Sequence, residues 1–266
     1  MTPALEPNVL PNPLLKWAGG KRWFVPTLAP IWKKFSGSRI VEPFCGGLAV
    51  SLGLAPRYSL LNDLNPHPVN LYQWIQRGLT ENIEMKNDES FYYATRERFN
   101  ALVSAHQADG VESALLFYYL NRSGYNGLCR FNSKGHFNVP FGKYRSIRYL
   151  TDFEVYRQAF SNWRFITGDF EEIQLESDDF VYADPPYDVE FTRYAAQDFG
   201  WDDQVRLAHW LTYHSGPVLL SNQATPRILA LYEKLGYTTQ LLSAPRMISC
   251  NGNRDRATEV LATRNI

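Results

Sequence analysis

Four consecutive residues, Asp184-Pro185-Pro186-Tyr187, carry the side chains best suited to chemistry in this sequence. An amine conjugated to an aromatic ring, such as N6 of adenine, is a poor nucleophile because its lone pair is delocalised into the ring. A carboxylate and a backbone carbonyl that both accept hydrogen bonds from the amine free that lone pair for an electrophilic methyl group. Successive prolines supply rigid carbonyls without N–H groups, and Tyr187 offers a flat face for stacking. The motif predicts methyl transfer to an amine; a plain Pro-Pro turn is the alternative.

A second motif, Glu42-Pro43-Phe44-Cys45-Gly46-Gly47, follows a short apolar run. Glycines at the end of a strand let the backbone approach a cofactor closely. Asp63 lies about twenty residues further on, where an acid in dinucleotide sites binds ribose hydroxyls. A helix cap or turn cap is the alternative role for Asp63. Together the two features predict a nucleoside-containing cofactor.

The stretch Lys16-Trp17-Ala18-Gly19-Gly20-Lys21 contains a Gly-Gly-Lys sequence. A phosphate-binding loop needs a glycine further upstream and a Ser or Thr after the lysine, but here Arg22 follows Lys21. We therefore do not expect a nucleotide triphosphatase. The five histidines have no H-E-x-x-H or other ligand spacing, so we expect no metal site.

A basic and aromatic stretch lies in the middle of the chain. Its notable residues are Arg122, Tyr125, Asn126, Arg130, Asn132, Lys134, Lys143, Tyr144 and Arg145. Arginine reads guanine bidentately in the major groove, and lysine contacts phosphates. An aromatic side chain such as Tyr125 could fill the gap beside a flipped base. This pattern favours nucleic-acid binding, with a polar surface loop as the alternative.

The charge balance alone argues against a nucleic-acid binder, because 27 basic and 27 acidic residues give a net charge of zero. The distribution of the charged residues along the chain argues for a nucleic-acid binder. Residues 7–41 and 121–150 contain bases but no acid, whereas acids concentrate between residues 169 and 203. Such segregation can build a positive face on a neutral protein.

Short apolar runs and helical spacings alternate along both ends of the chain. We expect strands at residues 39–44, 58–61, 179–183, 217–221, 237–242 and 258–263. We expect helices at 68–77, 91–106, 111–120, 204–214 and 225–235, and an exposed loop and hairpin at 121–149. The alternation predicts an α/β sheet with helices on both faces. Because ligands of such sheets bind at the carboxyl ends of strands, the motifs at 42–44, 62–63 and 184–187 should converge on one crevice.

The remaining composition points to a reducing compartment. Cys45, Cys129 and Cys250 are widely spaced and form no C-x-x-C pair, which argues against a disulfide framework. No apolar run of about 18 residues is present, so we expect no membrane span. Residues 1–13 resemble a loose Pro-rich tail and not a signal peptide. We expect a cytoplasmic protein.

Together these motifs resemble the Dam-like family of DNA adenine-N6 methyltransferases, from Leu15 to about Leu261 and in the family's order. The resemblance implies a Rossmann-like, S-adenosylmethionine-dependent methyltransferase sheet, formed by residues 1–65 and 151–266. It implies an inserted helical and hairpin target-recognition domain at 66–150. The catalytic residues would be Asp184, Pro185, Pro186 and Tyr187. The cofactor would contact Trp17, Ala18, Gly19, Lys21, Glu42, Phe44, Gly46, Asp63, Asp169, Phe170 and Asp184, with Asp169-Phe170 near its adenine.

The resemblance extends to the part of the family that reads GATC in double-stranded DNA. It implies that Lys16 and Arg130 contact guanines. Leu128 and Pro140 would pack around the thymine, while Tyr125 and Asn126 would support the gap beside the flipped adenine. The DNA-binding set would be Lys16, Arg122, Tyr125, Asn126, Leu128, Arg130, Asn132, Pro140, Tyr144 and Arg145. Residues 246–252 resemble a late loop of the family that also approaches DNA.

Two departures from the family are visible. Leu48 stands where the family often has another glycine, and the segment 188–200 is shorter than the corresponding loop of Dam itself. Two other functions stay open: methylation of a different amine (cytosine N4, RNA or a protein amide), and a catalytically silent DNA-binding relic. The family resemblance implies a monomer with no obligatory protein partner, acting in the bacterial nucleoid or, if phage-borne, in the host cytoplasm.

Overall fold

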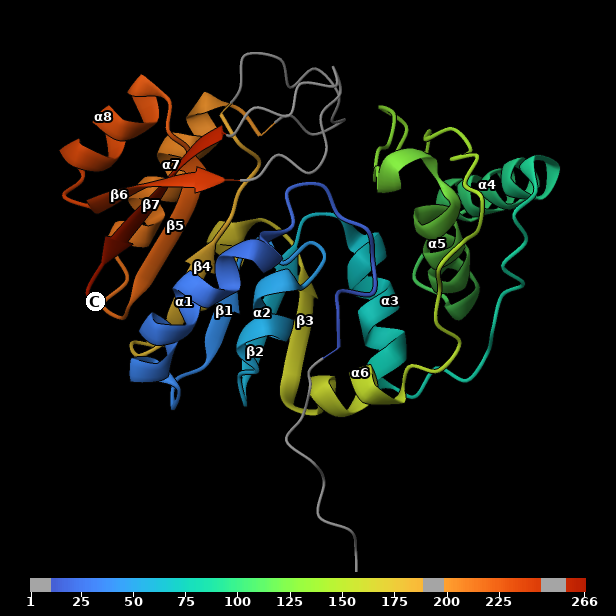
Figure 1. The fold of residues 1–266 in the computed structure, drawn as a ribbon, viewed down its shortest axis with the longest axis horizontal. Coiled ribbons are helices and arrows are strands. Elements are labelled where there is room, and N and C mark those ends of the chain that lie inside the picture. The colour runs from blue at the N-terminus through green and yellow to red at the C-terminus, as the bar shows by residue number, and fades with distance from the viewer. Residues whose placement is uncertain (1–10, 189–198, 245–256) are drawn as a thin grey trace, which may run out of the picture.

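A seven-stranded sheet forms the centre of the molecule (Figure 1). The structure is a computed structural model and describes residues 11–188, 199–244 and 257–266. The strand order is β3-β2-β1-β4-β5-β7-β6. The strands are β1 (Ile40–Glu42), β2 (Ser59–Asp63), β3 (Trp163–Thr167), β4 (Phe180–Ala183), β5 (Val218–Gln223), β6 (Thr238–Ala244) and β7 (Ala257–Arg264).

The first five strands in this order, β3 to β5, pair in parallel, and β7 enters antiparallel between β5 and β6. The chain moves outward from β1 to β2 and β3, and then returns to place β4 on the other side of β1. The point where the strand order reverses therefore lies between β1 and β4. The carboxyl ends of these strands are where an open α/β sheet binds ligands.

Helices lie on both faces of this sheet. The described helices of the whole fold are α1 (Val25–Trp32), α2 (Ala49–Leu54), α3 (Pro66–Gln76), α4 (Glu89–Ser104), α5 (Val111–Ser123), α6 (Glu154–Ala159), α7 (Trp201–Thr212) and α8 (Pro226–Lys234). Neighbouring residues of a strand serve opposite faces, because side chains alternate along it. Ile40 packs with residues of α1 and α2, whereas Val41 packs with residues of α7 and α8. These findings confirm an α/β, Rossmann-like methyltransferase fold.

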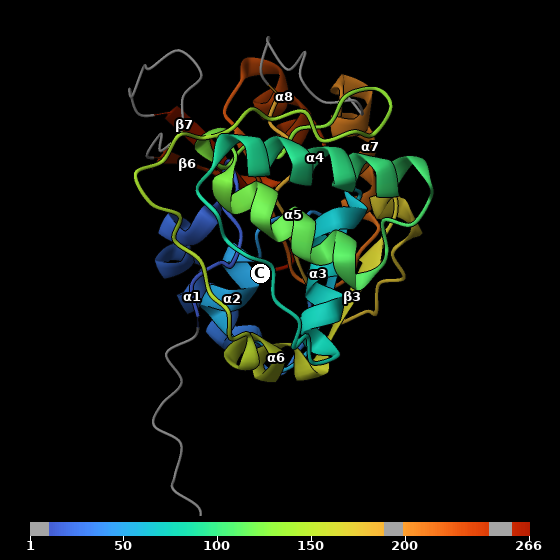
Figure 2. The same cartoon turned by 90° about the vertical axis from the view of Figure 1, so that its right-hand side faces the viewer.

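The segment between β2 and β3 forms a separate layer beside the sheet, where α4 and α5 cross above α3 (Figures 1 and 2). Asp88 caps α4 by accepting a hydrogen bond from the backbone of Phe91 at 2.7 Å, which starts this helix two residues before the expected position. A continuous apolar core joins the layer to the sheet. It contains Phe99 of α4, Phe117 of α5, Tyr72 of α3 and Phe165 of β3.

This shared core bears on the expected division of the chain. The expected boundary at residue 66 coincides with the start of α3, yet α3 packs with Phe165 of β3 as well as with α5. Helix α3 thus belongs to the cover of the sheet and to the base of the insert. The division into residues 1–65 with 151–266 and residues 66–150 stays a prediction.

The stretch 121–149 differs in part from its expectation of an exposed loop and hairpin. Isolated bridges join Gly124 to Phe141 and Phe131 to Phe137, in keeping with hairpin-like pairing. However, Phe137 and Val139 are fully buried. The expected exposure was wrong for these two side chains because the stretch folds back onto α4, where Phe137 packs on Phe99 with 6.3 Å between ring centroids.

Four regular elements were absent from the sequence expectations, namely α1, α2, α6 and β3. Strand β3 (Trp163–Thr167) alternates buried and exposed positions imperfectly, and it follows a short helix that gives little periodicity. Helix α1 contains Pro30 in its interior, which disfavours a helical interpretation. The late loop at 246–252 and most of the shortened segment 188–200 lie outside the described residues.

Asn121 of α5 fastens the insert to the N-terminal segment. Its Oδ1 accepts from the backbone N–H of Lys16 at 2.8 Å, and its Nδ2 donates to the backbone carbonyl of Lys16 at 2.8 Å. The Asn121 side chain is completely buried. Both backbone polar groups of Lys16 are thereby satisfied by one buried side chain.

We predict that Asn121→Leu lowers the free energy of unfolding by about 2–4 kcal/mol, because it leaves a buried N–H and a buried carbonyl without partners. Denaturant unfolding measures the change. Asn82→Ala, at an exposed position, is the matched control and should change stability by less than about 0.5 kcal/mol. A loss for Asn121→Leu no larger than that of the control would contradict the fastening role.

Candidate functional site

The expected motifs do converge at the carboxyl ends of the parallel strands. Glu42 ends β1, Asp63 ends β2, Asp169 follows β3 and Asp184 follows β4. Strand pairing sets Glu42 beside Leu61 on β2, and β1 pairs with β4 on its other side. Parallel pairing thus brings four acids to one edge, although up to about 140 residues separate them in sequence.

Asp184 has two partners on the same oxygen. The Ser221 hydroxyl donates to Asp184 Oδ1 at 2.7 Å, and Lys21 Nζ lies 3.1 Å from that atom. Lys21 is only 4% exposed. Burial raises the pKa of Asp184, and the charge of Lys21 with the Ser221 and Tyr187 hydroxyls opposes that rise. The lysine is therefore the main group that favours the ionised form of this carboxyl.

The other residues of this motif are held by neighbours from three elements. The Tyr187 hydroxyl donates to Glu259 Oε2 of β7 at 2.7 Å, and Lys21 Nζ lies 4.5 Å from the Tyr187 ring centroid. Gln204 of α7 donates to the Pro186 carbonyl at 2.8 Å. These contacts fix the turn and the plane of the tyrosine ring.

The acid at the end of β1 is enclosed. Glu42 accepts from the backbone and from the hydroxyl of Ser51 on α2. Burial raises the pKa of Glu42 to about 8, with the Ser51 bonds opposing. Asp63 Oδ2 accepts from the Gly46 backbone at 2.8 Å and Oδ1 accepts from Asn65 at 2.9 Å. Burial raises the pKa of Asp63 to about 6.

The two glycines after β1 serve a neighbour within the chain. A Cβ at Gly46 would lie 2.5 Å from Trp17 Nε1, and a Cβ at Gly47 would lie 2.8 Å from Trp17 Cβ. The side chain of Trp17 thus occupies the space that a larger residue at either position would need. Glycine at both positions therefore leaves room for Trp17 to pack here. Leu48 has a φ of 61°, a conformation that favours glycine.

An aromatic pocket of about 230 Å³ opens beside this edge. Phe44, Phe170 and Phe199 form its apolar wall, with Phe44 lying 5.8 Å from Phe170 and 5.4 Å from Phe199 between ring centroids. Asn62 and Asp169 supply polar atoms. Asn62 Oδ1 is buried and has no hydrogen-bond partner among the described residues. A flat aromatic base with polar edges suits this lining, so the residues fit the adenosine of the expected cofactor.

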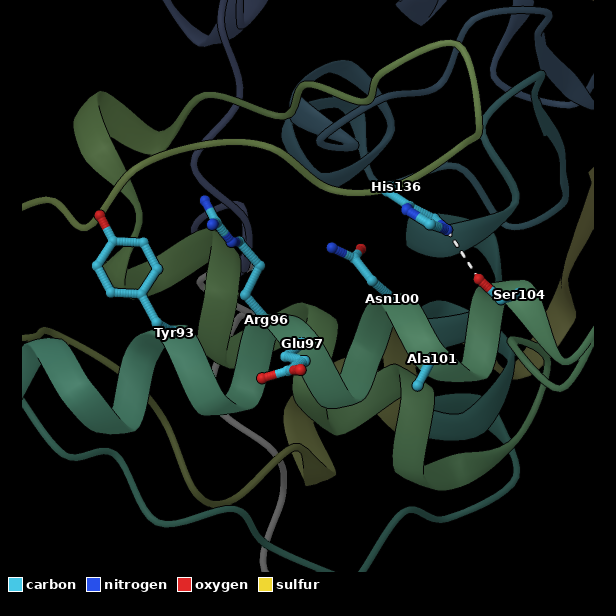
Figure 3. A pocket seen from close by; sticks show the side chains of 7 residues that line it. All are labelled: Tyr93, Arg96, Glu97, Asn100, Ala101, Ser104 and His136. Carbon is cyan, nitrogen blue, oxygen red and sulfur yellow. Dashed lines mark hydrogen bonds between the residues drawn. The ribbon is translucent and has the colours of Figure 1, made fainter.

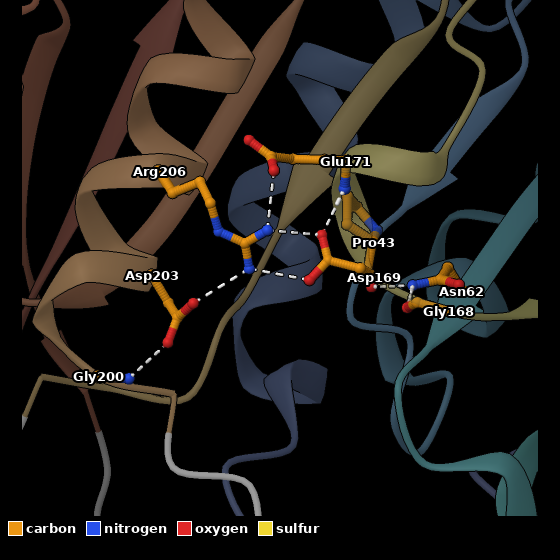
Figure 4. A network of polar contacts seen from close by, with 8 residues as sticks. All are labelled: Pro43, Asn62, Gly168, Asp169, Glu171, Gly200, Asp203 and Arg206. Atoms are coloured by element: carbon orange, nitrogen blue, oxygen red, sulfur yellow. Dashed lines mark hydrogen bonds and ion pairs between the residues drawn. The ribbon is translucent and has the colours of Figure 1, made fainter.

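Asp169 and Arg206 close one side of this pocket (Figure 4). The guanidinium of Arg206 on α7 binds both carboxylate oxygens of Asp169, at 2.9 Å and 2.8 Å, and also contacts Glu171 and Asp203. This hydrogen bonding lowers the pKa of Asp169. Asp169 and Phe170 therefore stand in the pocket, as the sequence resemblance implied.

A larger hollow of about 500 Å³ lies away from this edge, on the outer side of α4 (Figure 3). Its lining includes Tyr93, Arg96 and Asn100 of α4, and His136, which contacts Ser104 at 2.8 Å. None of the expected site residues lines it. The smaller aromatic pocket, which two of the motifs line, is therefore the better candidate for the cofactor.

Lys16 lies at the boundary between the N-terminal segment and the insert. Its ammonium donates to the Arg122 carbonyl at 2.9 Å and stands 3.7 Å from the Tyr144 ring centroid. Burial, together with the charge of Arg122, lowers the pKa of Lys16 to about 8. A Cβ at Gly127 would lie 2.3 Å from Lys16 Cβ, so glycine at this position leaves room for the Lys16 side chain.

The other basic residues of the insert differ in their freedom. The guanidinium of Arg122 donates to the carbonyls of Leu14 and Arg148, so it supports the packing of three segments. Arg130 Nε donates to Asn138 Oδ1 at 2.7 Å, which fixes its plane. The Oδ1 of Asn132 accepts from the backbones of Lys134 and His136. These contacts do not test the expected DNA contacts.

The remaining members of the expected DNA-binding set lie on the same stretch. Tyr125, Asn126, Pro140 and Arg145 are exposed, and Leu128 is half-buried. Asn126 has a φ of 52°. Of the expected cofactor residues, Ala18 and Gly19 are exposed and precede the buried Lys21, whose ammonium donates back to the Gly19 carbonyl at 3.1 Å.

Several residues of the site escaped sequence reasoning: Ser221, Gln204, Glu259 and Arg206. Ser221 stood at the end of an expected strand, and the strand-end rule could have identified it. Glu259 lies near the start of β7. Because β7 runs antiparallel to β5, the start of β7 lies beside the carboxyl end of β5, and this brings Glu259 to the site. No periodicity reveals that direction.

The described residues hold no group of three or more His, Cys, Asp or Glu side chains that could bind a metal ion. Cys45 and Cys129 are free thiols, and Cys250 lies outside the described residues. Among the helices that the structure describes, none is both long and apolar enough to cross a membrane.

We predict that the wild-type protein loses stability as pH rises from about 5 to about 8, because the folded state keeps Glu42 protonated whereas the unfolded chain releases that proton above the ordinary pKa of 4.5. Glu42→Gln should flatten this slope and gain on the order of 3 kcal/mol relative to wild type by pH 8. Denaturant unfolding at several pH values tests this. Glu97→Gln, at an exposed position, is the control, and a slope unchanged by Glu42→Gln would contradict the assignment.

Comparison with known proteins agrees with the geometry. Residues 17–248 match the family described as D12 class N6 adenine-specific DNA methyltransferase. The chain is 38% identical over 266 residues to the retron Ec67 DNA adenine methylase of Escherichia coli, covering 94% of this chain and 90% of that protein.

Two further relatives cover nearly the whole chain. This chain is 34% identical over 270 residues to the DNA adenine methylase of Escherichia coli K12, covering 93% of this chain and 93% of that protein. It is 32% identical over 277 residues to the type II methyltransferase M.MjaIII of Methanocaldococcus jannaschii, covering 91% of this chain and 94% of that protein. The chain therefore belongs to the D12 class of N6 adenine-specific DNA methyltransferases.

Proposed function

We propose that the protein methylates N6 of adenine within GATC in duplex DNA, after the base has turned out of the helix toward Asp184-Pro185-Pro186-Tyr187. The observation that carries the chemistry is the Asp184 carboxylate, which Ser221 and Lys21 bind at Oδ1. Both contacts fall on one oxygen, so we assign Oδ2 to accept a hydrogen bond from the target amine.

A second acceptor completes the arrangement. The Pro186 carbonyl already accepts from Gln204, so we assign the buried Pro185 carbonyl to the other N–H of the amine. Two acceptors at fixed positions draw the amine toward tetrahedral geometry and free its lone pair. Positioning and electrostatics of this kind supply most of the help that an enzyme gives when the cofactor carries the reactive group.

Lys21 has a distinct role in this proposal. Its ammonium keeps Asp184 ionised, and an ionised carboxylate is acceptor-only. The same ammonium lies 3.8 Å from Glu259, which in turn holds the Tyr187 hydroxyl. Tyr187 can then stack on the flipped base with its ring already oriented.

The cofactor, S-adenosylmethionine, supplies an electrophilic methyl group. We assign its adenine to the aromatic pocket of Phe44, Phe170 and Phe199, next to Asp169. Asp63, at the end of β2, is assigned to the ribose hydroxyls. Its Oδ1 and Oδ2 each accept one backbone hydrogen bond, and each retains a further acceptor position.

We propose that the exposed stretch of the insert reads the DNA. Arg130, oriented by Asn138, would read one guanine, since a guanidinium of fixed plane suits bidentate contact. Lys16 would contact the other guanine, and Leu128 and Pro140 would pack around the thymine. Tyr125 is 49% exposed and would fill the gap that the flipped adenine leaves, beside Asn126. Asn132, Tyr144, Arg145 and Arg122 would support this surface or hold the backbone.

The competing functions are less well supported. A silent DNA-binding relic has no need of a buried lysine that keeps Asp184 charged, because an unused buried ion pair costs desolvation. Cytosine N4, RNA or a protein amide could use the same acceptors, but the family and the basic insert favour DNA adenine. We propose that the protein works as a monomer on DNA in the cytoplasm.

The test is methyl transfer from labelled S-adenosylmethionine to a duplex with a single GATC, beside a duplex of equal composition in which that site is scrambled. We expect label in the first duplex alone. We expect Asp184→Asn to reduce the rate at least about 100-fold while DNA binding persists, because an amide presents one acceptor in place of a charged carboxylate.

The results separate the claims. Equal labelling of both duplexes would contradict GATC specificity but keep the adenine enzyme. Labelling of neither duplex by folded, cofactor-binding protein would contradict adenine in DNA as the substrate. An Asp184→Asn protein with wild-type turnover would contradict the catalytic assignment.

A further inference from the structure

Arg206 lines the aromatic pocket and has no role in the proposed reaction. It belongs to α7, where it contacts Asp203, and it extends toward η5 (Phe170–Glu172), where it contacts Asp169 and Glu171 (Figure 4). Asp203 also accepts from the backbone N–H of Gly200 at 2.9 Å. One side chain thus ties the loop after β3 to the first turns of α7.

The same guanidinium contacts the wall of the pocket. Its central carbon lies 4.4 Å from the Phe170 ring centroid. Phe170 in turn lies 5.8 Å from Phe44 and 6.3 Å from Phe199 between centroids. A guanidinium is planar and stacks on aromatic faces, which a lysine cannot reproduce. Arg206 therefore holds both a carboxylate and an aromatic wall of one pocket.

The hydrogen bonds of Asp169 leave room for a ligand. Its Oδ1 accepts from Arg206 at 2.9 Å and from the Glu171 backbone at 3.0 Å, and its Oδ2 accepts from Arg206 at 2.8 Å. A carboxylate has about four acceptor positions. Three are filled, so one remains, on Oδ2 of a side chain that lines the pocket. Arg206 thus fixes Asp169 without saturating it.

We propose that Arg206 is a positioning residue for cofactor selection: by fixing Asp169 it makes the pocket prefer a 6-aminopurine, which donates a hydrogen bond from its 6-position, over a 6-oxopurine, which accepts at that position. This inference rests on the proposed cofactor. A carboxylate that a bidentate arginine already fixes loses little further conformational entropy when a ligand donates a hydrogen bond to it. A carbonyl at the same place would face an acceptor-only oxygen and be repelled.

Calorimetry with the purified full-length protein tests the proposal without any methyl transfer. The probes are S-adenosylhomocysteine, with a 6-amino group and an unprotonated N1, and S-inosylhomocysteine, with a 6-oxo group and an N1–H. We expect wild type to bind the amino ligand at least about tenfold more tightly. Arg206→Met should weaken binding of the amino ligand about tenfold and that of the oxo ligand much less, so the preference shrinks. Arg206→Lys should recover only part of it.

Arg98→Met is the matched control, because Arg98 makes a similar bidentate pair with Glu112 on an exposed surface of α4 and α5. It should leave both affinities and the preference unchanged. Thermal melting without ligand identifies variants that are folded at the assay temperature. Equal weakening of both ligands in Arg206→Met, or no weakening of either, would overturn the selection role. If wild type binds neither ligand, the proposed cofactor itself fails; if wild type binds both and Arg206→Met keeps the preference, only the role of Arg206 fails.

Discussion

The site depends on the ion pairs that the buried ammonium of Lys21 forms. The ammonium stands 3.1 Å from Asp184 and 3.8 Å from Glu259, and the charge of Asp184 in turn raises the pKa of Glu42, a third acid nearby. Carboxyls gathered at the ends of β1 and β4 and near the start of β7 repel one another's charge and tend to take up protons. One cation in their midst allows Asp184 to stay ionised, and its second contact orients Tyr187 through Glu259.

The N-terminal segment delivers this lysine and also joins the two halves of the molecule. Within six residues, the Lys16 backbone pairs with Asn121 of the insert, Trp17 fills the space above Gly46 and Gly47, and Lys21 reaches Asp184. The segment therefore sets the position of the insert relative to the sheet and completes the site.

Sequence reasoning identified the site because its motifs stand at strand ends, where a parallel sheet must bring them together. The roles of the glycines were less predictable: Gly46 and Gly47 make room for Trp17, a packing fact that no local pattern contains. Glu259 and Arg206 were missed because strand direction and a tertiary contact place them. The burial of Phe137 and Val139 was not predicted, because a basic, Gly-rich stretch with aromatic side chains resembles an exposed surface that binds nucleic acid.

The most direct test of the central claim is the pH dependence of methyl transfer at saturating duplex and cofactor, measured for wild type, Lys21→Met and Lys21→Arg from about pH 5 to about pH 9. Loss of the cation removes the main group that lowers the pKa of Asp184, so the acidic limb of Lys21→Met should move to higher pH. Lys21→Arg should keep a limb close to that of wild type. A folded Lys21→Met protein with the wild-type acidic limb would contradict the claim that Lys21 keeps Asp184 ionised.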